Sequence, residues 1–295
     1  MQRARRIARC KGACYNQGKN LWSVEYMITQ SLHTHSTWDD GKNTAEEMVQ
    51  AAIGAGLESI GLSVHSPMPR DCAWAIKEEK LPAYRQEIAS LREKYREKIR
   101  VYCGVEWDVL SKTDLAPYDY VIGSVHRLPA EGFPEVDNSP EATARYIRES
   151  FAGDSDAAAV CYFEQLLRVA QEPQADIVGH FDLITKFDQT HGFFNPESPV
   201  YRRAARRAME ALVSAGKIFE INTGAISRGA RTTPYPSLEL LRELCGMGGH
   251  ITVSADAHFT AGIACAFDRA RELALAAGFA EIWELDGDTF APRKI

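Results

Sequence analysis

The chain has 295 residues, of which 45% are hydrophobic and 25% are charged, and its formal net charge is −6. This length suits one large domain with a sizeable buried core, and no apolar run of about 18 residues predicts a membrane-spanning helix. Five basic residues lie within the first eleven positions, so the rest of the chain carries 29 basic and 40 acidic side chains, a net charge of −11. Such an acidic body argues against tight binding to a nucleic-acid backbone.

Residues 1–27 are expected to form an N-terminal extension. The first eleven residues include no acidic side chain, and no apolar segment follows them, so they do not resemble a signal peptide. Three interpretations stay open: a disordered extension, a start placed too early with Met27 as the true beginning, and a functional basic arm. The seven cysteines are scattered and odd in number, which indicates reduced thiols and a cytoplasmic location.

Strand-like segments recur along the chain, and six of them end in a histidine or a carboxylate. Their apolar residues form nearly continuous runs, which is typical of parallel strands covered on both faces. If the strands are parallel, the side chains that close them meet at one end of the fold. The seven segments are Ile28–His35, Ser59–His65, Arg100–Glu106, Tyr120–His126, Asp176–His180, Lys217–Asn222 and His250–His258.

Helical patterns alternate with these strands. Thr44 and Glu47 have the spacing of a capping box at the start of the first helix. Later helices are expected at 81–98, 151–170, 199–215, 236–245 and 261–277. About seven βα units predict an α/β fold with a closed or nearly closed barrel of parallel strands and outer helices over residues 28–295, with an open doubly wound sheet as the alternative. The polar segment Glu131–Ser155 is expected to be a long loop and a candidate lid.

The side chains that close the strands have the chemistry of metal ligands. His33 and His35 are two apart on one strand, so both imidazoles can point the same way, and Asp256 and His258 repeat this arrangement. Glu106 could bridge two ions. A single histidine at a strand end is usually structural, but six of the eight histidines fall at this topological position, which favours a metal site. The remaining two do not fit: His191 lies in an expected loop, and His250 belongs at the opposite end of the barrel.

The ordered motifs resemble those of the polymerase-and-histidinol-phosphatase (PHP) superfamily, and within it most of all the monofunctional histidinol-phosphatases. The similarity covers roughly residues 28–275, and the ordered series is specific although each motif alone is weak. Glu220-Ile-Asn-Thr-Gly224 and Tyr235-Pro236 add to it. The six motifs are His33-Thr-His35, His65-Ser-Pro67, Gly104-Val-Glu106, Gly123-Ser-Val-His126, Val178-Gly-His180 and Asp256-Ala-His258.

This resemblance implies a distorted seven-stranded barrel that holds up to three divalent metal ions. The implied sets are His33, His35, Glu106 and Asp256 for the first ion, Glu106, His126 and His180 for the second, and Asp40, His65 and His258 for the third. Asp40 has a neighbour, Asp39, that could replace it. Val64 departs from the family, where an aspartate often precedes the histidine, and this departure concerns the surroundings of His65 rather than its ligation.

The implied activity is metal-dependent hydrolysis of L-histidinol phosphate, a late step of histidine biosynthesis. Metal ions acidify a bound water, so a metal-held hydroxide could attack phosphorus while phosphate bridges the ions. Asp256 or His258 could assist proton movement. Zinc, iron and manganese all suit such nitrogen and oxygen donors, and the expected partner is a small phosphate ester, with neither nucleic acid nor a membrane.

Fixed positive charge is expected to bind the phosphate. Arg127, Arg228 and Arg231 follow strand ends at the same end of the barrel, and a guanidinium group suits phosphate. Glu220 and Asn222 could bind a cationic amino alcohol, while Glu220 could equally be a group of the barrel interior. Two other functions stay open, namely a phosphoesterase for nucleotides or sugar phosphates, and an inactive regulatory module. No Walker-type loop and no Gly-x-Ser-x-Gly motif supports another hydrolase class.

Overall fold

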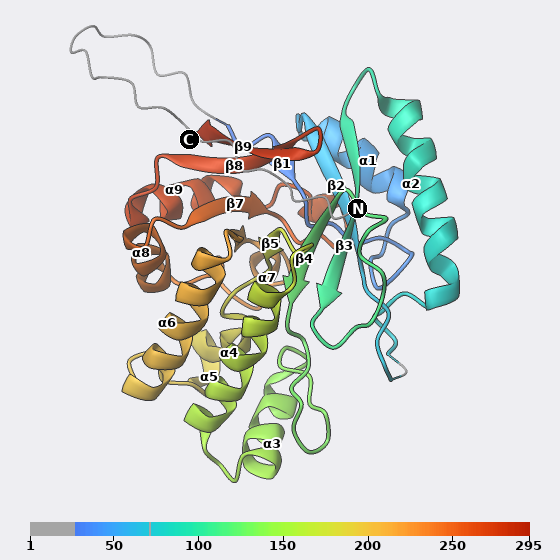
Figure 1. The fold of residues 1–295 in the computed structure, drawn as a ribbon. Coiled ribbons are helices and arrows are strands. Elements are labelled where there is room, and N and C mark those ends of the chain that lie inside the picture. The colour runs from blue at the N-terminus through green and yellow to red at the C-terminus, as the bar shows by residue number, and fades with distance from the viewer. Residues whose placement is uncertain (1–26, 71) are drawn as a thin grey trace, which may run out of the picture.

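The computed structural model describes residues 27–70 and 72–295, and within these ranges seven parallel strands follow one another in sequence order around a barrel (Figure 1). Backbone contacts between the first and last strand regions, His35 N to Ala257 O at 2.9 Å and Ala257 N to His33 O at 3.3 Å, bring the two edges together. The nearly closed barrel is therefore confirmed, and the sequential order excludes the doubly wound sheet. The strands are β1 (Gln30–Ser31), β2 (Ser59–His65), β3 (Arg100–Asp108), β4 (Tyr120–Ser124), β5 (Ile177–Val178), β6 (Ile218–Asn222) and β7 (His250–Ser254).

Several strands end earlier than the sequence predicts. β1, β4, β5 and β7 stop before their terminal histidine or aspartate, so most of the candidate ligands lie in the segments that follow the strands. At Asp256 the backbone has a φ of 45°, which a regular strand cannot include. β2 and β3 keep full register, with His65 directly opposite Glu106. The ligands thus combine rigid strand ends with irregular backbone that turns side chains inward.

Helices cover the outside of the barrel (Figure 1). The capping box is present at α1, where Glu47 N donates to Thr44 Oγ1 at 3.2 Å and Thr44 N donates to Glu47 Oε2 at 2.8 Å. The longer helices are α1 (Ala45–Gly54), α2 (Leu81–Tyr95), α3 (Pro140–Ser150), α4 (Ser155–Gln171), α6 (Pro199–Ser214), α8 (Leu238–Gly246) and α9 (Phe267–Ala277). Short turns of helix are η1 (Glu78–Lys80), η2 (Leu183–Thr185), α5 (Asp188–His191), α7 (Gly224–Ser227) and η3 (Thr260–Gly262).

The expected loop at 131–155 is wrong in its second half, which forms α3. Ser139 caps this helix by accepting a hydrogen bond from Ala142 N, and Thr143, Tyr146 and Ile147 bury one face. Ser139 followed by Pro140 is itself a helix-start signal, which the polar composition of the segment obscured. The irregular part before α3 lies at the carboxyl ends of the strands, where the candidate ligands also lie.

A hairpin of β8 (Glu281–Asp286) and β9 (Thr289–Lys294), which the sequence analysis did not predict, lies across the amino ends of the strands (Figure 1). Gln30 of β1 fixes it by donating to Leu285 O at 3.0 Å and accepting from Leu285 N at 2.8 Å. His250 packs on Trp283 with ring centroids 4.2 Å apart, at the end where the sequence places it. This end is closed by packing.

The barrel interior below the candidate ligands is filled by Tyr120. A Cβ atom added at Gly61 or Gly104 would lie 2.1 Å from the Tyr120 ring or hydroxyl, so both strands need glycine where the ring passes. The Tyr120 hydroxyl donates to Leu32 O. A separate apolar cluster, which includes Leu285 and Trp283 of the hairpin, surrounds this ring.

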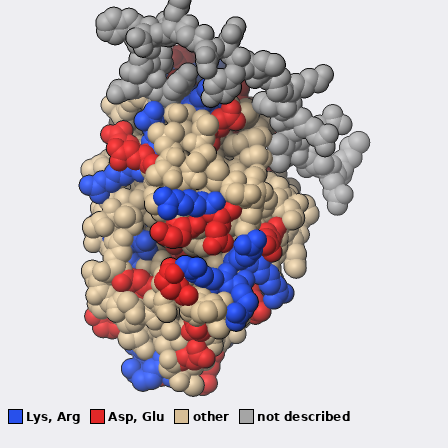
Figure 2. Space-filling view, turned by 90° about the vertical axis from the view of Figure 1, so that its left-hand side faces the viewer, with Lys and Arg blue, Asp and Glu red and all other residues tan. Residues whose placement is uncertain are grey.

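The surface mixes charges of both signs. On the face that carries α6 and α8, Lys and Arg side chains lie beside Asp and Glu side chains (Figure 2). On α6, for example, Arg206 pairs with Glu210 at 2.9 Å. No helix in the described part of the chain is long and apolar enough to cross a membrane.

Candidate metal centre

A cavity of about 230 Å³ opens at the carboxyl ends of the barrel strands. Seven of the nine expected metal ligands line it, and the other two, His33 and His35, are fully buried beneath it. A cavity of this size is smaller than the roughly 300–1,000 Å³ typical of drug-sized ligands, so it suits a small metabolite. The seven lining ligands are Asp40, His65, Glu106, His126, His180, Asp256 and His258.

One oxygen of Glu106 faces three imidazoles. Glu106 Oε2 lies 3.1 Å from His33 Nε2, 3.5 Å from His35 Nε2 and 2.8 Å from His65 Nδ1. The Glu106 side chain has no solvent exposure. This oxygen therefore sits at the centre of the cluster, where β2 and β3 place His65 and Glu106 side by side.

The other oxygen of Glu106 faces a second pair of histidines. Glu106 Oε1 lies 2.9 Å from His180 Nε2 and 3.2 Å from His126 Nε2. The two oxygens of one carboxylate thus point to different groups of nitrogen donors. This is the geometry of a carboxylate that bridges two cations.

Asp256 completes the first group. Its Oδ1 lies 3.5 Å from His35 Nε2 and 3.7 Å from His33 Nε2. The segment after β7 pairs with the segment after β1, so Asp256 converges with His33 and His35 although they are far apart in the sequence. Together with Glu106 Oε2 they form the set that the family resemblance implies for the first ion.

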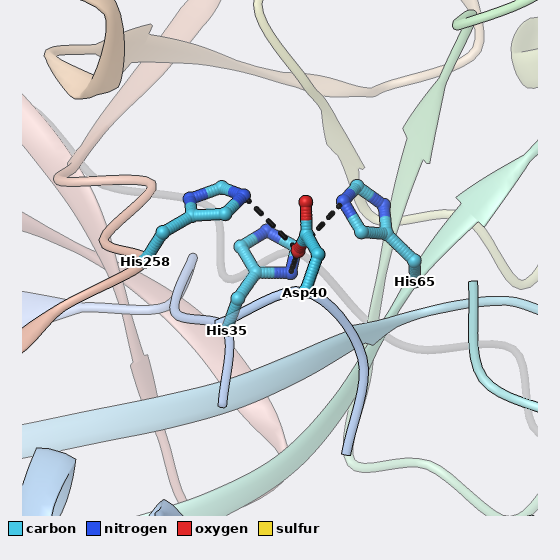
Figure 3. Close-up of side chains that lie close together, drawn as sticks. All are labelled: His35, Asp40, His65 and His258. Atoms are coloured by element: carbon cyan, nitrogen blue, oxygen red, sulfur yellow. Dashed lines mark ion pairs between the residues drawn. The ribbon is translucent and has the colours of Figure 1, made fainter. Parts of the chain in front are cut away.

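Asp40 forms the centre of the third group (Figure 3). Its Oδ1 lies 3.3 Å from His258 Nε2, 3.7 Å from His65 Nε2 and 4.0 Å from His35 Nδ1. The imidazole of His35 contacts both of the others, with its ring centroid 4.2 Å from that of His65 and 4.2 Å from that of His258. The geometry therefore favours Asp40 over its neighbour Asp39 as the carboxylate that faces a cation.

The groups whose donor atoms lie within 4.8 Å of one another differ in detail from the implied sets. They are His35, Asp40, His65 and His258; His33, His35 and Asp256; and His65, Glu106 and His126. His35 and His65 each belong to two groups. His180 belongs to none of the three, although its Nε2 contacts Glu106 Oε1.

Buried polar atoms without a hydrogen bond mark the places where a cation fits. A buried polar atom without a partner is costly, and native proteins rarely leave several together. Ligand atoms about 2.0–2.2 Å from a tetrahedral zinc ion lie about 3.3–3.6 Å apart, close to several of the distances given above. The donor set of imidazole nitrogen and carboxylate oxygen therefore fits several divalent cations. Among the expected ligands, the unpartnered atoms are His33 Nε2, His35 Nε2, His65 Nδ1 and Glu106 Oε2, which lie together, and His126 Nδ1 and His180 Nδ1, whose rings face Glu106 through Nε2 instead.

The central carboxylates stay ionised. Burial alone raises the pKa of the Glu106 carboxyl, but the neighbouring histidines, above all His33, lower that pKa well below its ordinary value. Burial likewise opposes the ionisation of Asp256, but Arg228 and His33 lower the pKa of Asp256 well below its ordinary value. Both groups thus present anionic oxygens at neutral pH.

Asp39 orients two candidate ligands. Its Oδ2 lies 2.7 Å from His35 Nδ1 and accepts a hydrogen bond from His65 N at 2.9 Å, while its Oδ1 accepts from Ser36 N at 3.0 Å. A proton on His35 Nδ1 leaves Nε2 free to face the cluster. Val64, the departure from the family pattern, packs in the apolar core, and Asp39 is the carboxylate that holds the backbone of His65.

Glu220 and Asn222 lie beneath the histidines and do not line the cavity. The Glu220 carboxylate lies 2.8 Å from His33 Nδ1 and accepts from His180 N at 3.0 Å and Asn222 Nδ2 at 2.8 Å. Both residues have 0% exposure. Glu220 thus holds His33 and His180 from the barrel interior and Asn222 holds Glu220, so this arrangement gives no support to the prediction that they bind a cationic substrate.

Of the three arginines expected to bind phosphate, Arg228 lines the cavity. Its Nη2 donates to Asp256 Oδ2 at 2.9 Å, its Nη1 donates to Asp256 O at 2.9 Å, and its Nη1 lies 2.8 Å from His258 Nδ1. Burial opposes the positive charge, but the Asp256 carboxylate raises the pKa of Arg228 above its ordinary value. Arg228 therefore supplies fixed positive charge beside the cluster.

The other two arginines point elsewhere. Arg127 pairs with Glu135 and donates to Phe133 O at 2.9 Å, on the wall of a neighbouring cavity. Arg231 is buried, donates to Thr185 O at 2.8 Å and lies 4.5 Å from the Tyr235 ring centroid. Both guanidinium groups are occupied by contacts within the chain, so phosphate binding by Arg127 or Arg231 stays a prediction that these contacts do not support.

Six cavity residues were not predicted from the sequence. Leu183 begins the short turn η2 and the other five lie in irregular segments, where neither spacing nor periodicity marks a side chain as functional. The expected lid segment was the one available signal, and three of the six lie in it. The residues are Trp74, Glu135, Asp137, Asn138, Leu183 and Lys186. His191 does not line the cavity, and it lies exposed at the end of the short helix α5 rather than in the expected loop.

Comparisons with known proteins agree with this architecture. A curated relative from Deinococcus radiodurans, named "Probable histidinol-phosphatase", is 32% identical over 241 residues, which cover 77% of this chain and 84% of the relative. A relative of the same name from Schizosaccharomyces pombe is 29% identical over 253 residues, covering 77% and 80%.

A solved structure shows the same fold. The histidinol phosphate phosphatase of Lactococcus lactis subsp. lactis Il1403, in complex with zinc, L-histidinol and phosphate, has a TM-score of 0.70 and 26% identity over 90% of this chain and 99% of that chain. The family model of the PHP domain matches residues 31–224. The chain therefore belongs to the PHP domain family.

Proposed function

We propose that this protein is a metal-dependent phosphomonoesterase that hydrolyses L-histidinol phosphate to L-histidinol and inorganic phosphate, in histidine biosynthesis. The observation that carries the proposal is the convergence of nine candidate ligand residues, Glu106 among them, at the floor of a cavity that also holds Arg228. The related Lactococcus lactis structure contains zinc, L-histidinol and phosphate together, which supports this substrate.

Two to three divalent ions fit the donors, with zinc first and iron or manganese as alternatives. When bound, such ions acidify water and stabilise negative charge on phosphate oxygens. The proposed ligands are His33, His35, Glu106 and Asp256 for one position, Glu106, His126 and His180 for a second, and Asp40, His65 and His258 for a third.

Arg228 and His258 give the chain its own means of handling charge and protons. His258 Nδ1 lies 2.8 Å from Arg228 Nη1 and 3.1 Å from Asp256 O, and because an arginine only donates hydrogen bonds, the shorter contact favours a neutral imidazole with its proton on Nε2. That atom faces Asp40 at the cavity, so it can give a proton to a leaving alkoxide only while the third position holds no ion. Asp256 was the other expected proton carrier, but its Oδ2 accepts from Arg228, so His258 suits the role better.

The size of the cavity supports a small phosphate ester as the partner, rather than nucleic acid or a membrane. Five cysteines in the described ranges are free thiols, which supports a cytoplasmic location. We also propose that residues 28–295 form one domain. The suggested extension at 1–27 lies, apart from Met27, outside the described residues.

A substrate panel with metal analysis tests the proposal. Purified protein is analysed for bound metal and assayed on L-histidinol phosphate, nucleoside monophosphates, sugar phosphates and an oligonucleotide. We expect at least two ions per chain and kcat/KM highest for L-histidinol phosphate. A nucleotide or sugar phosphate preferred by about tenfold, a difference of about 1.4 kcal/mol, would refute the substrate. Full loss of activity on chelation and recovery on adding zinc is the expected control.

A further inference from the structure

Two acidic side chains of the cavity have no role in the function proposed above. Glu135 and Asp137 both come from the segment between β4 and α3. The oxygens of Glu135 are occupied: Oε1 accepts from Trp74 Nε1 at 2.9 Å and from Arg127, and Oε2 accepts from Asn138 Nδ2 at 2.7 Å. Glu135 therefore anchors its own segment and has little capacity left for a ligand.

Asp137 keeps one carboxylate oxygen free. Its Oδ2 accepts from Lys186 Nζ at 3.0 Å, and its backbone oxygen accepts from the same ammonium group at 2.9 Å. Oδ1 accepts no hydrogen bond from the residues in the described ranges, and the side chain is 26% exposed on the cavity. Asp137 can therefore accept a hydrogen bond from a ligand there.

Lys186 is the matching cation. Its ammonium group carries three donors, of which Asp137 takes two, so one N–H remains. Its side chain is 13% exposed and lines the same cavity. An anionic oxygen and a cationic donor thus lie side by side on one wall.

The other cavity carboxylates have competing roles. Asp40, Glu106 and Asp256 all belong to the groups that could hold metal ions. Asp137 is the acid that remains for an organic cation. A ligand that itself carries a phosphate and an ammonium group a short chain apart complements the neighbouring Lys186 and Asp137.

We propose that Asp137 and Lys186 form a subsite for phosphate esters of 2-amino alcohols. Asp137 Oδ1 accepts a hydrogen bond from the substrate ammonium, and the free N–H of Lys186 points to the phosphate end. The assignment rests on the proposed phosphatase function for the position of the phosphate, and it extends that function by naming the residue that recognises the amine.

Matched pairs of substrates test the subsite. The pairs are L-histidinol phosphate with its analogue lacking the amine, and phosphoethanolamine with ethyl phosphate. Wild-type protein should prefer the amine in each pair. Asp137→Asn should lower kcat/KM for the amines by about 10- to 100-fold, mainly through KM, because a hydrogen bond to a charged group is lost. The amine-free esters should lose less than about threefold.

Two further variants distinguish substrate binding by this subsite from a purely structural role of its residues. Lys186→Met should lower kcat/KM for both members of each pair alike, because it acts on the phosphate end. Glu149→Gln is the control. It removes a carboxylate on α3 that is 58% exposed, paired with Arg148 and outside the cavity, so kcat/KM for both members of each pair should stay unchanged. Thermal melts of all variants verify folding.

Equal losses on both members of a pair in Asp137→Asn would show that Asp137 only holds Lys186, which overturns the subsite. If the wild-type protein ignores L-histidinol phosphate yet prefers phosphoethanolamine over ethyl phosphate, the proposed substrate fails while the subsite stands. Calorimetry on wild-type protein in the presence of inorganic phosphate tests the subsite without a variant, because it compares the affinities of two alcohols. L-histidinol should bind about 10-fold or more tightly than the alcohol lacking the amine, and equal binding overturns the proposal.

Discussion

The two ends of the barrel are built from the same seven strands but differ in how their polar groups are satisfied. At the amino end, the β8–β9 hairpin closes the interior, and Gln30 pairs with both backbone groups of Leu285. At the carboxyl end, buried atoms such as His33 Nε2 and Glu106 Oε2 face one another without hydrogen bonds. The amino end therefore contributes to stability, whereas the carboxyl end keeps buried nitrogen and oxygen atoms without hydrogen bonds close together for function.

The largest expected effect comes from Glu106→Gln, which removes the carboxylate that two groups of histidines share. We expect kcat/KM to fall by about 10³-fold or more and the metal content to fall by at least one ion per chain, because charge stabilisation by the bound ions is lost. Steady-state kinetics and elemental analysis measure both.

His191→Ala is the control for this variant, because His191 is an exposed histidine outside the cavity. It should keep wild-type activity and metal content. Full metal content in Glu106→Gln would show that the carboxylate does not hold the ions.

Trp283→Ala tests the amino end of the barrel. Trp283 is 7% exposed and packs in the cluster around Tyr120, so its removal should cost about 3–5 kcal/mol of unfolding free energy. Folded protein should keep its metal content and its kcat/KM at low temperature. Denaturant unfolding with parallel assays tests this, and a large loss of kcat/KM in the folded variant would mean that the two ends are not independent.

Asp39→Asn sharpens the account of the carboxyl end, since Asp39 contacts His35 and the backbone of His65. Loss of this orienting carboxylate should weaken metal affinity by about 10- to 100-fold with little change in the fold. Competition with a chelator measures the affinity. Asp288→Asn, in an exposed turn, is the matched control, and equal affinities of the two variants would remove Asp39 from the account.

The smallest expected effect concerns Asp188, whose Oδ2 is also buried without a partner but does not line the cavity. Burial raises the pKa of Asp188 from 3.8 to about 6, against hydrogen bonds from Phe194 N and Phe193 N. The folded state thus binds this proton more tightly than the unfolded state, so the carboxyl costs stability as pH rises from about 4 to 6.

Asp188→Asn should therefore stabilise the protein at pH 7 by about 1 kcal/mol, after allowance for partial exposure, and leave stability at pH 4 unchanged. Thermal melts of variant and wild type across this range measure the difference. A benefit at pH 4 that vanishes at pH 7 would reverse the assigned sign.

The sequence predicts the barrel and the donors well for a physical reason. Short apolar runs indicate where the strands lie, and a side chain such as His65 or Glu106 closes each run at its carboxyl end. Parallel strands place these carboxyl ends at the same end of the barrel. Most of the nine candidate ligands could therefore be named before the structure. The C-terminal hairpin had a signal too, since Asp286-Gly287 between two apolar segments is typical of a tight turn.

The remaining site residues depend on tertiary contacts that local sequence does not encode. Which face of β6 carries Glu220 inward depends on the sheet around it. Arg127 and Arg231 have long side chains whose positions are set by distant partners, Glu135 and Thr185. Asp137 lies in an irregular segment, where only the folded chain brings it to Lys186.

The central claim is that the carboxyl end of the barrel gathers its donors to hold several cations around Glu106. A crystal of the protein grown with zinc, measured at the zinc absorption edge, tests this directly. The account predicts two or three anomalous peaks, each within about 2.0–2.3 Å of His33, His126, His258 or their neighbouring donors. An empty cluster at saturating zinc, or ions bound only at other places on the protein, would contradict it.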